Sequence, residues 1–161
     1  MTEKTLLIVW HSRTGGAEAM ARAAAETDEA AVILKRAGEA TPEDLRAADS
    51  YIFACPENLA SMSGVMKDFF DRCYYPVLGK IEGRPYATMI CAGSDGEGAA
   101  RQIARIALGW RLKPIAAPLI ICTHAQSAEA ILAPKTIAEA DLVKCGELGA
   151  TMAAGLAMGI F

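Results

Sequence analysis

The sequence lacks the excess of basic residues that nucleic-acid binding requires. Its 161 residues include 16 lysines and arginines against 19 aspartates and glutamates, which gives a net charge of −3 at pH 7. No positive surplus is therefore present to neutralise phosphates, and we exclude a nucleic-acid partner. The negative excess is small, which argues more weakly against an electron carrier that docks through a strongly acidic face.

Metal-ligating residues are also few. The chain has two histidines and five cysteines, and no two cysteines have the C-x-x-C spacing. These numbers and spacings provide no zinc-type cluster, so we predict no metal site. Cys55, Cys91 and Cys122 end apolar runs. We interpret the cysteines as small buried side chains of a cytoplasmic, reduced protein.

Long hydrophobic runs are absent as well. The uncharged C-terminal stretch, residues 148–161, is shorter than the ~20 residues needed to cross a bilayer. The apolar run at residues 5–10 is too short for the hydrophobic region of a signal peptide. We therefore predict no membrane span and a cytoplasmic location.

Apolar runs alternate with helical patterns along the chain. Strands are predicted at 5–10, 31–34, 50–55, 85–92 and 118–122. Helices are predicted at 17–27, 42–48, 65–72, 99–110 and 137–160, the last broken or weakened by its glycines. This order predicts one α/β domain, 1–161, with a five-stranded, doubly wound parallel sheet between two helical layers. Ligands bind beyond the carboxyl ends of such strands, which places the candidate site at 11–16, 56–63, 93–98 and 123–128.

The first of these loops has the composition of an anion site. Hydroxyls at Ser12 and Thr14 precede two glycines at the start of a helix, an arrangement that suits a phosphate. An ordinary strand–helix turn is the alternative. The loop contains neither a Walker sequence nor G-x-G-x-x-G. The terminal acidic residues of a receiver domain and the C-x5-R of a cysteine phosphatase are missing too.

Residues 8–16, I-V-W-H-S-R-T-G-G, resemble the FMN phosphate loop of the flavodoxin-like superfamily. Trp10 stands where Tyr or Phe is usual, and Ala17 replaces a Thr, which lowers the expected affinity for FMN. The resemblance implies a flavodoxin-like, three-layer fold with strand order 2-1-3-4-5. It also implies that the cofactor-binding residues here are Ser12, Arg13, Thr14, Gly15, Gly16 and Ala17.

The second loop strengthens the resemblance. Residues 56–72 are similar to the P-E-Y-N-x-S-x-x-G-x-x-K-x-x-x-D stretch of NAD(P)H-dependent FMN reductases, and also to a segment of multimeric quinone-reductase flavodoxins. Asn58-Leu59 replaces Tyr-Asn, so the aromatic ring that often stacks on the flavin is missing. The resemblance implies flavin contacts from Pro56, Glu57, Asn58, Leu59, Ser61 and Met62. The third loop is similar to loops that border the flavin pyrimidine edge, which implies contacts from Gly93, Ser94, Asp95, Gly96 and Gly98.

The resemblance implies an FMN-dependent enzyme that takes hydride from NAD(P)H and reduces a quinone or similar small acceptor through flavin N5. The alternatives are a flavodoxin-type carrier without NAD(P)H activity and a flavodoxin-like domain that has lost FMN. The mild charge favours the reductase over the carrier. No catalytic side chain is assigned, and His11 and His124 are interpreted as polar loop residues. The apolar C-terminal helix, with glycines at 149, 155 and 159, is expected to pack tightly on the sheet and to form a homodimer face.

Overall fold

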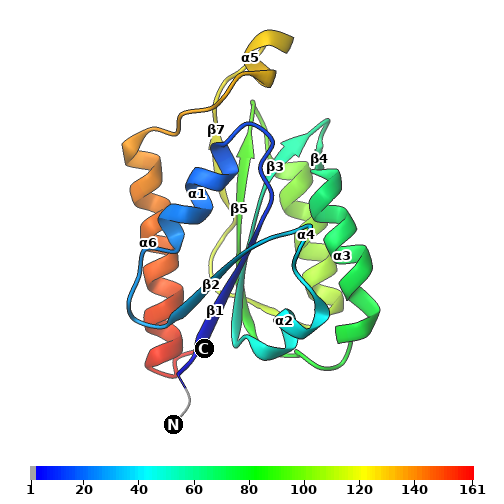
Figure 1. The fold of residues 1–161 in the computed structure, drawn as a ribbon, viewed down its shortest axis with the longest axis vertical. Coiled ribbons are helices and arrows are strands. Elements are labelled where there is room, and N and C mark those ends of the chain that lie inside the picture. Colours follow the sequence, from blue (N-terminus) through cyan, green and yellow to red (C-terminus); the bar gives the residue numbers. More distant parts are fainter. Residues whose placement is uncertain (1–2) are drawn as a thin grey trace.

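The computed structural model describes residues 3–161, which form a parallel sheet between two layers of helices (Figure 1). The hydrogen-bonded order is β2-β1-β3-β5, and β6 and β7 share the fifth position beside β5. The strands are β1 (Thr5–Trp10), β2 (Ala31–Arg36), β3 (Ser50–Asn58), β5 (Pro85–Ala92), β6 (Lys113–Pro114) and β7 (Leu119–Cys122). The predicted fold class and the strand order 2-1-3-4-5 are confirmed.

Helices cover both faces of the sheet. Figure 1 shows α1 and α6 on one face and α3 and α4 on the other, with the short α5 beyond one end of the sheet. The helices are α1 (Gly16–Ala24), α2 (Pro42–Ala47), α3 (Gly64–Val77), α4 (Glu97–Gly109), α5 (Ala128–Leu132) and α6 (Glu139–Ala157). Thr41 caps α2 by accepting a hydrogen bond from the backbone N–H of Asp44.

Alternation along the strands divides the core in two. Leu7 and Val9 of β1 face α3 and α4, whereas Leu6 and Ile8 face α1 and α6. Successive side chains of a strand point to opposite faces, so a continuous apolar run fills both cores at once. This is why the uninterrupted runs of β1 and β5 were correctly predicted to be buried strands.

Aromatic side chains dominate the core beneath α3 and α4. The Phe53 ring lies 5.1 Å from that of Phe70 and 6.2 Å from that of Phe69, measured between centroids. Tyr74 stacks on Trp110 at 5.7 Å. Such clusters bury large areas and hold α3 and α4 firmly on the sheet, so the loops that begin these helices start from a rigid base.

The core beneath α6 depends on close helix–helix packing. Gly149 of α6 faces the backbone of Ala24 in α1, and a Cβ on Gly149 would overlap the Ala24 carbonyl. The C-terminal helix is not broken by its glycines, because α6 runs without interruption over 19 residues. The contact with α1 compensates for the low helix propensity of glycine.

Other boundaries also differ from the prediction. β3 continues beyond Cys55 to Asn58 and turns back into β4 (Ser61–Met62), so the segment predicted as a loop contains an antiparallel hairpin. Helix α3 continues five residues past Arg72 to Val77. Among the described residues, 3–161, no helix is long and apolar enough to cross a membrane.

Candidate functional site

Four segments meet at the carboxyl end of the sheet. They are the first loop (11–16), the second loop with its hairpin (56–63), the third loop (93–98) and a long connection from β7 to α6, residues 123–138, here called the strap. Figure 1 shows the strap and α5 beyond the same end of the sheet at which β1, β3 and β5 finish. Parallel strands bring these connections together, as the doubly wound topology predicts.

The first loop presents the start of α1 to this end of the sheet. Gly15 adopts a left-handed conformation with φ 97°, which glycine accepts without steric cost. The Ser12 hydroxyl accepts a hydrogen bond from the Gly15 N–H at 3.0 Å and closes the turn. Within the described residues, no side chain caps α1. The first N–H groups of a helix have no intrahelical partner, so this terminus is suited to an anion.

Ala17 points away from that terminus. Its methyl group is buried in the core between α1, α6 and the sheet. The residue therefore contributes packing and a backbone N–H, but no hydroxyl. Arg13, by contrast, is an exposed residue of the loop.

A histidine links the first and second loops. His11 Nδ1 lies 2.8 Å from Ser63 Oγ, and the His11 backbone N–H donates to the Ala54 carbonyl at 2.9 Å. Partial burial, and next the charge of Arg13, lower the pKa of the His11 ring. The ring is thus neutral at pH 7 and acts as a hydrogen-bonding bridge between the loops.

The tip of the β3–β4 hairpin is strained and apolar. Leu59 and Ala60 have φ values of 51° and 63°, a region that non-glycine residues rarely occupy. The Leu59 side chain is fully exposed. Positive φ at both central positions is the geometry of a type I′ turn, which matches the twist of paired strands, so the hairpin imposes this conformation on residues that do not favour it.

Glu57 joins the second loop to the third. Its Oε1 accepts from the Gly96 N–H at 2.8 Å, and its Oε2 accepts from the Ala99 N–H at 3.1 Å. The carboxylate therefore caps the N-terminus of α4, where the helix dipole favours a negative charge. Glu57 is one of the residues predicted to contact the cofactor, but both of its carboxylate oxygens accept hydrogen bonds from backbone N–H groups.

Two further contacts fix the same junction. Gly98 approaches the hairpin so closely that a Cβ would overlap the Ala60 carbonyl. Gln102 Oε1 accepts from Ser61 Oγ at 3.0 Å and from the Met62 N–H at 2.8 Å. The second and third loops thus form one unit held by backbone and side-chain hydrogen bonds. Gln102 lies inside α4, and no sequence pattern indicated its role.

The strap connects the third loop back to the first. The N–H groups of Thr123 and His124 donate to the Ala92 and Gly93 carbonyls at 2.9 and 2.8 Å. At its other end, the Lys135 N–H donates to the Thr14 carbonyl at 2.8 Å. The four segments therefore form a closed ring of contacts. The sequence predicted residues 123–128 at this site, but not the remainder of the strap.

A cavity of about 430 Å³ opens on the β2 side of the first loop. His11 and Ser12 line it together with Trp10, residues 36–39, Glu18 and Val65. The Arg36 guanidinium lies 5.5 Å from the Trp10 ring centroid on this side. The second loop, from 56 to 63, and the third loop do not line this cavity. It thus adjoins the first loop from outside the ring of four segments.

The buried cysteines near the site offer no nucleophile. Burial raises the pKa of Cys55 to about 12 and also raises that of Cys91. Both thiols are protonated at neutral pH, and a protonated thiol is a poor nucleophile. In residues 3–161, no group of three His, Cys, Asp or Glu side chains is placed to hold a metal ion.

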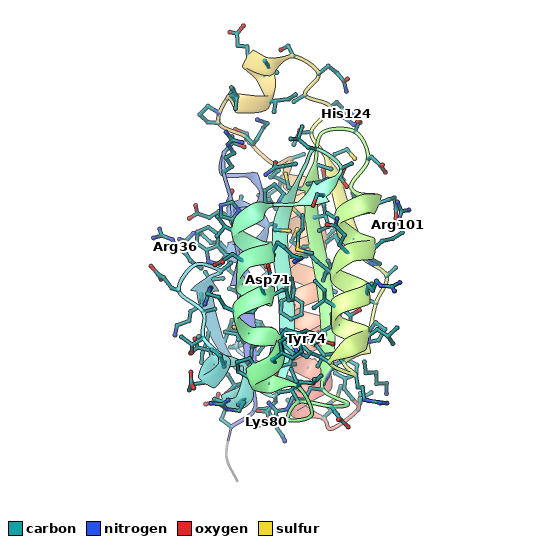
Figure 2. All side chains as sticks on the ribbon, turned by 90° about the vertical axis from the view of Figure 1, so that its right-hand side faces the viewer. Arg36, Asp71, Tyr74, Lys80, Arg101 and His124 are labelled. Carbon is teal, nitrogen blue, oxygen red and sulfur yellow. The ribbon has the colours of Figure 1, made fainter. Side chains whose placement is uncertain are left out.

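Figure 2 places the remaining polar side chains. His124 lies near the N-terminal end of the strap, and Arg101 lies on the outer side of α4. Tyr74 and Lys80 lie toward the opposite end of the molecule. The structure brings the predicted residues of all three loops to one end of the sheet. Their contacts with a cofactor stay predictions.

The comparison with known families identifies the class of protein. Residues 17–126 match the family described as NADPH-dependent FMN reductase. The chain belongs to this family. The match includes the second and third loops and begins at Ala17, directly after the first loop. Membership confirms the predicted resemblance and confirms FMN as the cofactor expected for this chain.

Individual relatives agree with this class. A flavodoxin of Aquifex aeolicus (strain VF5) is 33% identical over 97 residues, which cover 58% of this chain and 52% of the relative. The match thus spans about half of that relative's length. An archaeal flavodoxin has the same fold with a TM-score of 0.75 at 18% identity, covering 96% of this chain and 99% of the other. A WrbA-like flavodoxin from Agrobacterium tumefaciens has a TM-score of 0.69 at 21% identity, covering 97% and 98% of the two chains.

Proposed function

We propose that residues 1–161 act as one domain that binds FMN at the carboxyl end of β1, β3 and β5 and reduces a quinone or similar small acceptor with NAD(P)H. The observation that carries the proposal is the linkage of the three predicted loops at the end of the sheet where the uncapped start of α1 lies. The family to which the chain belongs supports the cofactor and the nicotinamide donor.

The first loop fits the phosphate of FMN. Gly15 and Gly16 bring backbone close to the ligand, and the first-turn N–H groups of α1 point out of the helix as donors. Arg13 is an exposed residue of this loop and adds positive charge. Ala17 supplies no hydroxyl, so backbone donors rather than side chains would hold the phosphate.

The second and third loops fit a flat ring. The Glu57 carboxylate and Gln102 fix the distance between the loops. Leu59 presents an exposed apolar side chain at the hairpin tip, next to Asn58, which stands where an aromatic residue is usual. When bound there, FMN supplies hydride transfer at its N5 atom. The chain's own contribution is to hold the ring in place between apolar and glycine-rich walls.

The backbone of the third loop is only partly available to such a ring. The N–H groups of Gly96 and Ala99 are bound by Glu57, and the N–H of Glu97 donates to Asp95 Oδ1 at 3.3 Å. A protein acid or base is not needed in this proposal. Proton delivery to the acceptor is assigned to solvent, because the neutral His11 ring is engaged by Ser63.

The acceptor, the homodimer and the cytoplasmic location belong to the same proposal. Met158 and Ile160 stay exposed at the C-terminal end of α6 and support self-association through that end. Analytical ultracentrifugation tests the dimer directly. A monomer at tens of micromolar would remove that part of the proposal and leave the FMN site untouched.

An electron-carrier function is the second candidate. The observation that favours it is the relative from Aquifex aeolicus, which is named a flavodoxin. The net charge of −3 favours the reductase, because carriers use a strong acidic surplus to steer toward basic partners.

One experiment separates these functions. The apoprotein is titrated with FMN, and NAD(P)H oxidation is then followed anaerobically with a soluble quinone. We expect FMN binding and quinone-dependent NAD(P)H consumption. FMN binding with a stable one-electron reduced form and no NAD(P)H oxidation would support the carrier. The absence of FMN binding at high micromolar concentration would exclude both.

Leu59 should show opposite effects on stability and binding. Leu59→Gly relieves the positive φ and is expected to raise the free energy of unfolding by about 0.5–1 kcal/mol. The same change removes the apolar wall and is expected to weaken FMN binding several-fold. Urea denaturation and flavin fluorescence measure the two effects. Ala60→Gly is the matched control, since it relieves the neighbouring φ of 63° and removes only a methyl group. Equal FMN affinity in both variants would contradict the role given to Leu59.

A further inference from the structure

The strap brings a positive charge to the first loop. Lys135 is anchored there through its backbone N–H, which donates to the Thr14 carbonyl at 2.8 Å. A Cβ on Gly16 would lie 3.5 Å from the Lys135 Cβ. The Lys135 side chain therefore starts beside Gly16, the first residue of α1, although Lys135 comes 119 positions later in the sequence.

The Lys135 ammonium is held in place without being neutralised. Its Nζ donates to the carbonyls of Ile131 and Ala133 at 2.8 and 2.6 Å. Carbonyl oxygens are neutral acceptors, so the ammonium keeps its full charge and one of its three N–H donors. Four other lysines pair with carboxylates, namely Lys4, Lys35, Lys67 and Lys144. In residues 3–161, no carboxylate lies within 4.0 Å of the Lys135 ammonium.

The acidic residue of the α1 first turn does not cancel this charge. Glu18 Oε2 accepts from Arg22 at 2.9 Å, one turn further along the same helix. The start of α1 is thus bordered by Arg13 from the first loop and by Lys135 from the strap. Charges interact over about 8–10 Å at physiological ionic strength, so a lysine whose Cβ lies beside Gly16 is placed to act on an anion at this helix terminus.

We propose that Lys135 is a further cofactor-binding residue, which favours the phosphorylated flavin FMN over riboflavin. The inference rests on the proposed FMN site. It adds that the strap, and not only the first loop, recognises the phosphate group. Riboflavin has the same ring and ribityl chain but no phosphate, so Lys135 distinguishes the two flavins by charge alone.

The test compares two flavins and four proteins. Dissociation constants for FMN and riboflavin are measured by flavin fluorescence with the wild type, Lys135→Gln, Lys135→Arg and Lys113→Gln. Lys113 is an exposed lysine on β6, which pairs with the beginning of β5 at the opposite end of the sheet. Its replacement makes the same change in net charge away from the site. All four proteins keep the backbone N–H at position 135 that donates to the Thr14 carbonyl.

We expect Lys135→Gln to weaken FMN binding about three- to tenfold and to leave riboflavin binding unchanged. Lys135→Arg should restore FMN binding, and Lys113→Gln should have no effect on either flavin. Added salt should reduce the FMN preference of the wild type but not that of Lys135→Gln.

Three results would overturn the inference. Equal weakening of both flavins would show that Lys135 only orders the strap. Unchanged FMN affinity would show that its charge does not reach the phosphate. If circular dichroism shows that Lys135→Gln does not fold, the salt dependence of the wild type decides instead. A wild-type preference for FMN over riboflavin that does not change with salt would then overturn the inference. Wild-type protein that binds neither flavin would overturn the proposed function itself, which is a different outcome from all three.

Discussion

Glu57→Gln is expected to lower the free energy of unfolding by about 1–3 kcal/mol and to weaken FMN binding about tenfold. The glutamine amide keeps one acceptor oxygen for Gly96 or Ala99 but turns an NH2 group toward the other N–H. The substitution also removes the negative charge from the N-terminus of α4. The α4 terminus and the hairpin then lose the bond that sets their separation, and the flavin ring loses its rigid walls.

Urea denaturation and flavin fluorescence measure these two effects. Glu82→Gln is the control, since Glu82 is an exposed glutamate in the turn after α3 and its replacement makes the same change in charge. Loss of stability with unchanged FMN affinity would mean that Glu57 stabilises the fold without positioning the loops for a cofactor. Unchanged stability would contradict the helix-capping role itself.

Gly149→Ala is expected to destabilise the protein by about 3 kcal/mol, although alanine is a far better helix former than glycine. The added methyl group would overlap the Ala24 carbonyl, which belongs to the backbone of α1 and cannot rotate away. The two helices must separate, and the core residues beneath them lose contact. The loss should be visible as a lower urea midpoint with an unchanged m-value.

Gly146→Ala is the matched control three residues earlier on α6. There the added Cβ would lie 3.6 Å from the Ala23 carbonyl, which is an ordinary contact. Without a clash, the gain in helix propensity should stabilise the protein by about 0.5–1 kcal/mol. Similar stabilities for the two alanine variants would contradict the proposed close approach of α1 and α6.

Local patterns were sufficient to predict the strands of the sheet and to bring the candidate loops to one end of it. Thr5–Trp10 and Pro85–Ala92 are strands with the predicted limits, because uninterrupted apolar runs are stable only where both faces of a strand are covered. The glycines and hydroxyls after β1 likewise indicated an anion site from their positions at the end of a strand and the start of a helix.

The long-range contacts could not be predicted from the sequence. Glu57 bonds to groups 39 and 42 residues away, and Gln102 bonds to a hairpin 40 residues before it. Neither residue type indicates which backbone N–H or hydroxyl it will meet. The hairpin was predicted as a loop because Leu59 and Ala60 are not the residues that usually occupy positive φ in a tight turn.

The sequence by itself determined the class of fold and predicted the end of the sheet at which a ligand binds, whereas the order of the strands was implied by the resemblance to a known family. The class of fold follows from the periodicity of apolar side chains and from the right-handed connections of parallel strands, which are local or topological constraints. Only the tertiary structure decided what each polar side chain contacts. It assigned Glu57 to the α4 terminus and brought Lys135 to the start of α1. Hydrogen bonds and charges act over a few ångströms, and only the folded chain brings residues so far apart in the sequence within that range.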